Sequence, residues 1–136
     1  MAGARGRWVW VRTLSALEKT ATRAACDRLA VEILTPRWLL ESRPAGLAHP
    51  IRIFCRQSGS KYSFVARCRS VEPETEGEEF DIPFARLDHD EEAHAELRFH
   101  VMWLRHTGRW WPLHVSVTLE EALGLIETSP VLRPFL

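Results

Sequence analysis

Cysteine and long apolar runs are both scarce in this sequence, and each shortage excludes a class of protein. The three cysteines, Cys26, Cys55 and Cys68, are odd in number and widely spaced. This argues against a framework of disulfides and favours a reducing compartment. After the start MAGARGR, only the run from Trp8 to Val11 is apolar, so neither a signal peptide nor a bilayer-spanning segment is predicted. We therefore expect a cytoplasmic bacterial protein with no membrane partner.

Net charge is missing as well, since 18 basic residues balance 18 acidic ones. Domains that bind nucleic acid are usually basic, so this balance counts against that class. The charge is nevertheless divided unevenly along the chain. Residues 37–69 contain seven basic residues and one acidic residue, whereas residues 70–96 contain eleven acidic residues and one basic residue. Almost all the basic residues are arginine, whose planar guanidinium favours bidentate contacts.

Catalytic and cofactor motifs are also absent. The sequence has no GxSxG elbow, no glycine-rich phosphate loop, and none of the metal-binding patterns CxxC, HExxH or HxH. The carboxylates cluster in loops, where solvation gives them no reason for the raised pKa that an acid catalyst needs. The sequence therefore predicts no catalytic residue and no cofactor, and an enzyme is the less expected class.

The most informative stretch is Arg98–Val117, RFHVMWLRHTGRWWPLHVSV. Alternating side chains predict two half-buried strands joined around Thr107 and Gly108. A three-residue loop with Gly108 in the left-handed conformation keeps the apolar residues on one face. The pairs expected on that face are Trp103 with Trp111, Val101 with Leu113, Phe99 with Val115 and Leu97 with Val117.

The other face of this predicted hairpin is mixed. Its expected pairs are Leu104 with Trp110, Met102 with Pro112, His100 with His114 and Arg98 with Ser116. One end is therefore apolar, and the other carries two histidines and an arginine. Any function is expected on this second face.

Two helices are predicted at the ends of the domain. Ser15 with Glu18, and Thr118 with Glu121, each form a capping-box pattern. The first helix is expected from Thr13 to about residue 34, because the following proline disfavours helical geometry in the residue before it. Its apolar stripe is expected to contain Leu14, Leu17, Ala21, Ala24, Ala25, Arg28 and Leu29.

Strands are predicted over residues 51–56, 61–69 and 80–87, with a mobile acidic loop at 70–79. A turn at Ser58 and Gly59 is expected to pair Ile53 with Phe64, Cys55 with Tyr62 and Ile51 with Ala66 on one face, and to leave the basic residues on the other. Pro83 suggests an edge strand or a bulge in the third. Short turns favour an antiparallel sheet, so the expected fold class is α+β, with an N-terminal helix, about five strands and a C-terminal helix. Residues 1–12 are expected to form an arm and residues 13–136 a single domain. The predicted core is Leu17, Ala21, Ala25, Ile53, Phe64, Phe84, Phe99, Val101, Trp103, Trp111, Leu113, Val115, Leu123 and Ile126.

Several segments resemble a bacterial family of small uncharacterised proteins. They are GSKYSF at 59–64, GEEFDIPFARLDH at 77–89, WLRHTGRWW at 103–111 and VTLEEALGLIE at 117–127, which include the RHTGxWW and TLEEAL segments. More distantly, the chain is similar to a domain of unknown function whose paired strands carry an arginine, a turn and a tryptophan. The resemblance covers about residues 13–133. It implies one compact domain, and no activity, cofactor or catalytic residue.

A metal site around His100 and His114 is one hypothesis, because cross-strand neighbours lie roughly 5 Å apart. A third ligand is missing, since Cys55 and Cys68 are expected on the apolar face. Two partly solvated strand histidines are the simpler interpretation. The sequence therefore predicts no metal site.

Single-stranded nucleic acid is a second hypothesis, with phosphates on arginine and bases on aromatic rings. The candidate residues are Arg52, Arg67, Arg69 and Arg98 with Trp110 or Tyr62. The competing interpretation, which we favour, is that the basic and acidic blocks neutralise each other across one sheet.

Protein interaction is the preferred hypothesis. The group Met102, Leu104, Trp110 and Pro112 combines tryptophan and methionine with nearby arginines, as interface cores do. The alternative is that the N-terminal helix or the WVWV segment covers this group. We expect a non-enzymatic binding module that acts on a protein partner or forms a homo-oligomer. Its candidate binding residues are Arg98, His100, Met102, Trp110, His114, Arg67 and Arg69.

Overall fold

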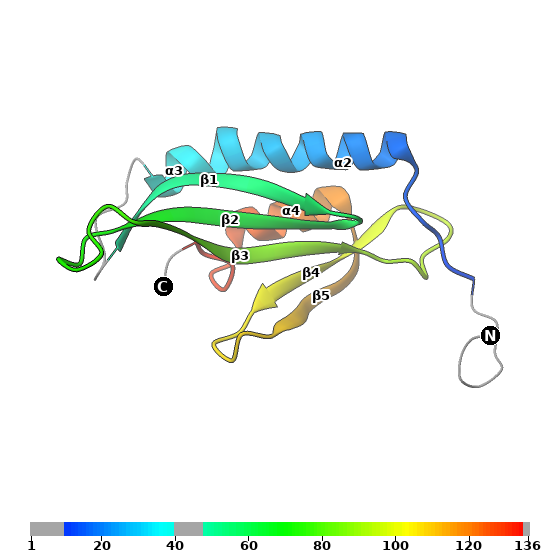
Figure 1. Ribbon diagram of the computed structural model, residues 1–136. Coiled ribbons are helices and arrows are strands. Elements are labelled where there is room, and N and C mark those ends of the chain that lie inside the picture. The colour runs from blue at the N-terminus through cyan, green and yellow to red at the C-terminus, as the bar shows by residue number, and fades with distance from the viewer. Residues whose placement is uncertain (1–9, 40–47, 135–136) are drawn as a thin grey trace.

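The computed structural model describes residues 10–39 and 48–134 as two layers, with helices on one face of a five-stranded antiparallel sheet (Figure 1). The strand order is β1-β2-β3-β4-β5, so each strand pairs with its neighbour in sequence. This confirms the α+β class. The elements are α2 (Ala16–Arg28), η1 (Leu29–Leu34), α3 (Thr35–Leu39), β1 (Ala48–Ser58), β2 (Lys61–Ser70), β3 (Glu79–His89), β4 (Arg98–Leu104), β5 (Trp110–Thr118) and α4 (Leu119–Thr128).

Both predicted capping boxes are present. The Ser15 hydroxyl accepts the backbone N–H of Glu18, and the Glu18 carboxylate accepts the backbone N–H of Ser15. Thr118 and Glu121 do the same at the start of α4. Each box satisfies backbone donors that a helix start otherwise leaves unpaired.

The buried stripe of the first helix differs from the predicted one. The side chains that face the sheet are Leu14, Thr22, Cys26, Leu29, Ala30 and Leu34. Leu17 is 83% exposed and Ala21 is also exposed, so the prediction that both lie in the core is wrong. Polar Thr22 faces the sheet in their place, and its hydroxyl has no hydrogen-bond partner among the described residues.

The first helix also continues past Leu34, where the sequence predicts its end. A π-helical segment, Leu29–Leu34, leads directly into α3, which contains Pro36. In this wider turn the backbone N–H and the hydroxyl of Thr35 both donate to the carbonyl of Ala30. Because the π turn shifts the hydrogen-bond pattern, the helix continues in the same direction past Pro36, although proline usually ends a helix.

The β1–β2 hairpin has the predicted faces but a register two residues from the predicted one. Cys55 pairs with Phe64 rather than Tyr62, because Gly59 and Ser60 make a two-residue turn between Ser58 and Lys61. A shift of two residues preserves the face of every side chain. The predicted bulge at Pro83 is also confirmed, since the β2–β3 register shifts there.

The β4–β5 hairpin follows the prediction near its turn and departs from it farther away. Trp103 pairs with Trp111 and Met102 with Pro112, as expected. Two bulges in β5 then shift the register, so Val101 lies opposite His114 and Phe99 opposite Val117. The predicted pairs of His100 with His114 and of Arg98 with Ser116 are therefore wrong, since Arg98 lies opposite Thr118.

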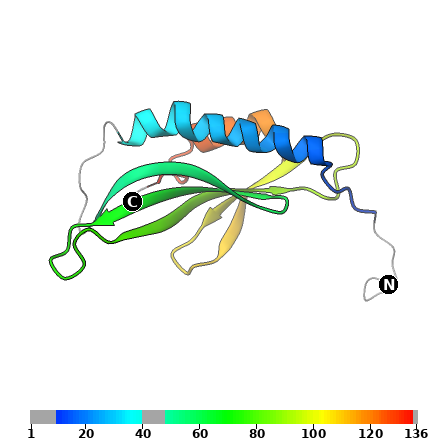
Figure 2. The same cartoon turned by 45° about the horizontal axis from the view of Figure 1, so that its top comes forward.

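The core lies between the helices and the β1–β4 part of the sheet. Of the predicted residues, Ile53, Phe64, Phe84, Phe99, Val101 and Ile126 are buried, while Trp103, Leu113 and Leu123 are partly buried against them. Trp111 is 46% exposed and Val115 63% exposed, so their assignment to the core is wrong. The reason is visible in Figures 1 and 2, where the free end of the β4–β5 hairpin turns away from the helices.

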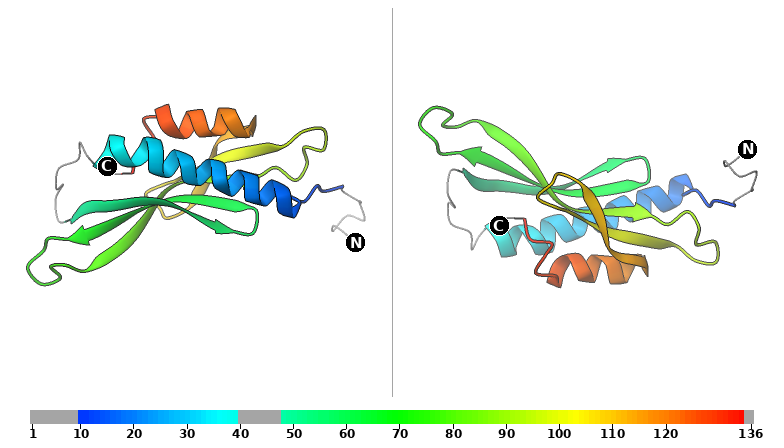
Figure 3. Two further views of the ribbon diagram at one scale, coloured as in Figure 1. Left: turned by 90° about the horizontal axis from the view of Figure 1, so that it is seen from above. Right: turned by 90° about the horizontal axis from the view of Figure 1, so that it is seen from below.

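No helix within the described residues is long and apolar enough to cross a lipid bilayer. Both helices lie on the same side of the sheet, as the views from above and below show (Figure 3). None of the described helices covers the opposite side, which is called the outer face below.

Candidate functional site

The outer face carries more positive than negative charge. Strand alternation and the observed registers bring together on it seven basic side chains, Arg52, Arg56, Lys61, Arg67, Arg69, Arg86 and Arg98, and three acidic ones, Glu79, Asp81 and Asp88. The division of charge in the sequence thus becomes a pattern on one surface. Whether the acidic residues neutralise the arginines depends on the contacts between them.

Three arginines surround one aromatic ring at the β1–β2 end of this face. The guanidinium carbons of Arg52, Arg56 and Arg67 lie 4.7, 5.6 and 5.0 Å from the centroid of the Phe54 ring. The Asp81 carboxylate accepts hydrogen bonds from Arg67 at 2.9 and 3.2 Å and from Arg56 at 2.7 Å. We call these five residues the Phe54 cluster.

The hydrogen bonds from Arg67, opposed by partial burial and assisted by the charges of Arg67 and Arg56, hold the pKa of Asp81 below its usual range. The same carboxylate raises the pKa of Arg67. One acidic side chain therefore stabilises two guanidinium groups in their charged forms. Arg52 makes no ion pair with any described residue, so the cluster keeps an excess of positive charge.

One further ion pair joins the basic and acidic blocks across the sheet, whereas two others link residues that are two positions apart in the chain. Arg69 pairs with Glu79 at 3.0 Å, and Arg86 binds Asp88 through two hydrogen bonds of 2.6 and 2.8 Å. Arg98 pairs with Glu96. The acids that serve the outer-face strands thus come mainly from β3, and not from the acidic turn at residues 71–78. That turn is held by its own hydrogen bonds, including one between the hydroxyls of Ser70 and Thr75.

The apolar end of the outer face is the Trp110 patch, defined as Met102, Leu104, Trp110 and Pro112. Pro112 is exposed and the other three side chains are half-buried. Arg86 stacks over the Trp110 ring at 4.7 Å while it holds Asp88. The N-terminal helix does not cover the patch, because it lies on the other side of the sheet (Figure 3). Trp8 and Val9 of the WVWV segment lie outside the described residues, and Trp10 and Val11 are exposed.

The opposite side of the hairpin end carries a second group of stacked side chains. The Arg105 guanidinium lies 5.8 Å from the Trp103 ring and 5.2 Å from the Trp111 ring. Its Nε atom is buried and has no hydrogen-bond partner among the described residues. We call Trp103, Arg105 and Trp111 the Arg105 stack. It places a half-buried guanidinium against two indole rings.

The histidine end of the outer face is occupied by internal hydrogen bonds. His100 Nδ1 accepts the backbone N–H of Ser116 at 3.0 Å, and Arg98 donates to the Ser116 carbonyl at 2.7 Å. Ser116 has a φ of 54°, in the left-handed region that favours glycine. Arg98 and His100 therefore hold a strained residue of a β5 bulge in place.

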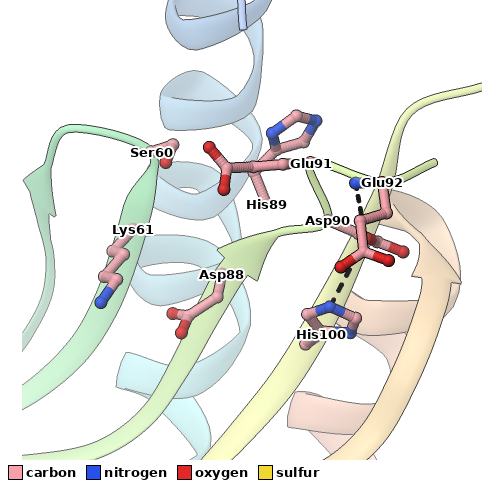
Figure 4. A pocket seen from close by; sticks show the side chains of 8 residues that line it. All are labelled: Ser60, Lys61, Asp88, His89, Asp90, Glu91, Glu92 and His100. Carbon is pink, nitrogen blue, oxygen red and sulfur yellow. Dashed lines mark hydrogen bonds and ion pairs between the residues drawn. The ribbon is translucent and has the colours of Figure 1, made fainter. Parts of the chain in front are cut away.

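An open hollow of about 380 Å³ lies beside this network, lined by Ser60, Lys61, Asp88, His89, Asp90, Glu91, Glu92 and His100 (Figure 4). His100 Nε2 is 3.6 Å from the Asp90 carboxylate. Because Nδ1 is an acceptor, the proton of the neutral ring is on Nε2 and points to Asp90. Burial raises the pKa of Asp90, but hydrogen bonds, first from the Ser116 side chain and then from the Glu92 backbone, lead the effects that hold that pKa below its usual range.

His89 points away from Asp88, Asp90 and His100 (Figure 4). Its ring is buried edge-on against Phe99 at 5.8 Å, and both ring nitrogens lack a hydrogen-bond partner among the described residues. Burial, and then the charge of Arg12, lower the pKa of His89. This histidine is a neutral core side chain and contributes no ligand to the hollow.

The sequence-predicted candidates thus fall into separate groups. Met102 and Trp110 share one patch, and Arg67 and Arg69 lie at the other end of the face beside Asp81 and Glu79. The remaining three do not converge, since Arg98 and His100 bind Ser116 whereas His114 lies opposite Val101.

Sequence reasoning missed seven residues of these groups. They are Phe54, Arg56, Asp81, Arg86 and Arg105, together with Trp103 and Trp111, which it assigned to the core. The sequence does contain a signal for Phe54, because Arg52, Phe54 and Arg56 occupy every second position of β1 and therefore share one face. Asp81 and Arg67 are direct cross-strand partners, but only a correct β2–β3 register reveals this. Arg105 lies beyond the end of β4, where alternation gives no signal.

Within the described residues, no group of three or more histidine, cysteine, aspartate or glutamate side chains is arranged to hold a metal ion. No curated protein and no solved structure matches the chain. The profile of one protein family does match, and it covers residues 14–132, which include every strand and both groups of stacked side chains. The chain therefore belongs to the family described as a domain of unknown function, DUF3024.

Proposed function

We propose that this chain is a non-enzymatic binding protein and that the free end of its β4–β5 hairpin contacts a partner protein. The observation that carries the proposal is the Arg105 stack. Trp103, Trp111 and Arg105 are the residue types that dominate binding energy at protein interfaces, and Trp111 is nearly half exposed. An arginine held against two indole rings is already positioned for a partner, which can reach its terminal nitrogens and the exposed Trp111 ring.

The chemistry of the stack favours an acidic partner. Arg105 makes no ion pair with any described residue, and Arg109 lies in the same loop. A carboxylate of the partner is expected to bind the guanidinium, and an apolar side chain beside it to pack on the Trp111 ring. The Trp110 patch, on the other side of the same hairpin, extends this surface.

The test is to install a photo-crosslinking amino acid at Arg109, capture the partner from an extract of the source organism, and measure the affinity of the purified pair by calorimetry. Arg105→Ala and Trp111→Ala are each expected to weaken binding by at least about 30-fold, the loss typical of a central interface residue. Leu17→Ala is the matched control, because Leu17 is an exposed apolar residue on the helical side.

A partner whose affinity is unchanged by both hairpin variants, or is lowered by Leu17→Ala, contradicts the proposal. Light scattering on the isolated chain distinguishes a second copy from a different protein. If the chain self-associates through this surface, Trp111→Ala converts the oligomer to monomer. The low cysteine content supports a cytoplasmic location for this chain, where either kind of partner would have to meet it.

Single-stranded nucleic acid is the second candidate, and the Phe54 cluster favours it. An uncovered sheet face with arginines around an aromatic ring is a common platform for stacked bases and phosphates. Against it, Arg56, Arg67, Arg69, Arg86 and Arg98 already have carboxylate partners. Fluorescence anisotropy with a labelled oligothymidine at low salt tests this candidate. It is rejected if no binding is seen, or if Arg52→Ala leaves binding unchanged.

The hypothesis of an enzyme or metal site around His100 and His114 depended on contact between the two rings, and we do not propose it. The two histidines are not cross-strand neighbours, and both ring nitrogens of His100 face other groups of the chain.

A further inference from the structure

The bulge in the β4–β5 hairpin is held by a histidine side chain instead of a regular backbone pair. Phe99 and Val101 each pair with a residue of β5, whereas His100 between them has no Cα partner within the described strand. The His100 ring is used instead, since its Nδ1 accepts the backbone N–H of Ser116 at 3.0 Å. A titratable side chain therefore makes the bond at the point where the hairpin bends.

This hydrogen bond can form in only one charge state of the His100 ring. An imidazole nitrogen accepts a hydrogen bond only while it carries no proton, and in the imidazolium both nitrogens are donors. The proton of the neutral ring is on Nε2, which is 3.6 Å from the Asp90 carboxylate. A second proton can therefore be added only at Nδ1, where it meets the N–H of Ser116. Two donors cannot bond to each other, so protonation of His100 breaks the bond.

Ser116 depends on this bond because its backbone is strained. Its φ of 54° lies in the left-handed region, which serine occupies only when neighbouring groups hold it there. His100 holds its N–H, and Arg98 holds its carbonyl through a hydrogen bond of 2.7 Å. Loss of the first bond leaves an N–H without its acceptor at a strained residue. Relaxation of that φ then changes the course of β5.

Most of the charged side chains around His100 favour its charged form. They come from β2, β3, the loop that follows β3, and β4, and they are Lys61, Asp88, Asp90, Glu91, Glu92 and Arg98 (Figure 4). Four of the six are carboxylates, although Asp88 already binds Arg86. The only titratable side chain of β5 is His114. An imidazolium is therefore stabilised on the side of the hollow, where it faces Asp90.

From these contacts we propose that His100 is a pH-sensitive switch for the direction of the β4–β5 hairpin. The neutral ring fixes the bulge at Ser116, and the charged ring releases it, so the free end of the hairpin changes its angle to the sheet. The base of the hairpin stays in place, because Phe99 is fully buried and Val117 packs against the core. Histidine changes its charge between about pH 5 and pH 8, so the switch operates near neutral pH.

The test is nuclear magnetic resonance on the folded, ¹⁵N-labelled full-length chain between pH 8 and pH 5. The chemical shifts of the His100 ring nitrogens report when Nδ1 gains a proton. Over the same pH range, the protection of the Ser116 amide against hydrogen exchange is expected to fall at least about tenfold, the scale of one lost hydrogen bond. Residual dipolar couplings of residues 101–114, compared with those of α2, measure the angle of the hairpin and are expected to change together with the ring.

Three variants separate the switch from a general effect of acid. His100→Asn places an oxygen where Nδ1 lies, so it accepts the same N–H without titrating, and its hairpin is expected to keep one angle from pH 8 to pH 5. Ser116→Gly is expected to behave likewise, because glycine holds a φ of 54° without the bond. His114→Asn is the matched control, since it removes the other histidine of the hairpin strands and must leave the change in place.

The proposal is overturned if the hairpin couplings stay constant while the His100 ring gains its proton, or if the ring stays neutral down to pH 5. It is equally overturned if His100→Asn changes with pH as the wild type does, or if His114→Asn abolishes the change. All three variants retain the buried His89, so a loss of stability in acid that originates there appears in each of them. None of these measurements depends on the partner proposed for the hairpin.

Discussion

A single carboxylate organises the basic end of the outer face. Asp81 binds two guanidinium groups that also lie against the Phe54 ring, so it limits the repulsion between Arg56 and Arg67. Arginine suits this arrangement because its planar group stacks on a ring and offers donors in the same plane. A lysine in either position keeps the charge but loses that combination.

Asp81→Asn is expected to destabilise the fold by about 1 kcal/mol at pH 7, the scale of a partly exposed, bidentate ion pair. Because folding lowers the pKa of Asp81, its contribution is fully present above the unfolded value of 3.8 and is lost as the pH falls through the lower folded value. Urea midpoints at pH 7 and pH 3 check this. The difference between wild type and variant must shrink at the lower pH, and a constant difference would show that charge is not its cause.

The buried ring of His89 gives a second prediction. Here the stability is set by polar atoms that lack a partner, and not by an ion pair. Its two ring nitrogens are buried without a described partner, which costs stability. His89→Leu removes both polar atoms with a small change of volume, so it is expected to stabilise the fold by roughly 1 kcal/mol at pH 7.

The pH dependence separates this cause from general packing. Folding lowers the pKa of His89, so wild-type stability is full above the unfolded value of 6.5 and falls as the pH drops below it. Urea midpoints between pH 8 and pH 5 are expected to show a smaller decline in His89→Leu than in wild type. A less stable variant with an unchanged decline would mean that the ring nitrogens are satisfied.

At the scale of elements, β5 is the strand whose bulges decide where the hairpin points. Two extra residues in β5 separate the register near Trp111 from the register near Val117. Bulges increase local twist, in agreement with the turning of the hairpin away from the helices in Figure 2. The exposure of Trp111 and Val115 follows from this bend.

Ser116 is the residue to test, because its φ of 54° strains any side chain that branches at Cβ. Ser116→Val is expected to destabilise the fold by roughly 1–3 kcal/mol. Ser116→Gly accepts the backbone conformation and keeps the backbone bonds to His100 and Arg98, so its stability is expected within about 1 kcal/mol of wild type. Thermal melts of the three proteins are the measurement. Equal loss in both variants would place the importance of Ser116 in its hydroxyl.

These bulges also mark the limit of prediction from sequence. Capping boxes, the faces of β1 and β2 and the Trp103–Trp111 pair depend on local spacing, and all three are confirmed. The His100–His114 pair failed because a bulge has no sequence signal as strong as alternation. The prediction that Leu17 lies in the core is wrong for a different reason. Helical periodicity identifies apolar stripes along a helix, but it does not show which of two neighbouring stripes packs against the sheet.

At the scale of the whole molecule, the two faces of the sheet carry different kinds of residue. The helical face contains the core, while the outer face and the hairpin end hold the stacked arginines. Substitutions at the hairpin end are therefore separable from folding, because Trp111 and Arg105 lie outside the buried cluster. This separation is what allows the proposed binding surface to be tested with folded variants.

The distribution of charge leads to the last prediction. The chain has no net charge, yet the turn at residues 71–78, which contains four glutamates, lies at one end of the molecule (Figure 3). The basic excess lies on the strands of the outer face. Without net repulsion, the acidic turn of one molecule is attracted to the basic face of another. We therefore expect weak, reversible self-association at low ionic strength near pH 7, and its loss at about 0.3 M salt, where the screening length is only a few ångströms.

Static light scattering over a range of protein concentrations measures this attraction. Glu74→Gln with Glu76→Gln is the informative variant, because both side chains are exposed in the turn and carry no ion pair among the described residues. The variant is expected to show little concentration dependence at low salt, since it carries net positive charge and a weaker acidic end. Association that persists in both the variant and high salt would be apolar, and would then point to Trp111 and the hairpin end as the contact.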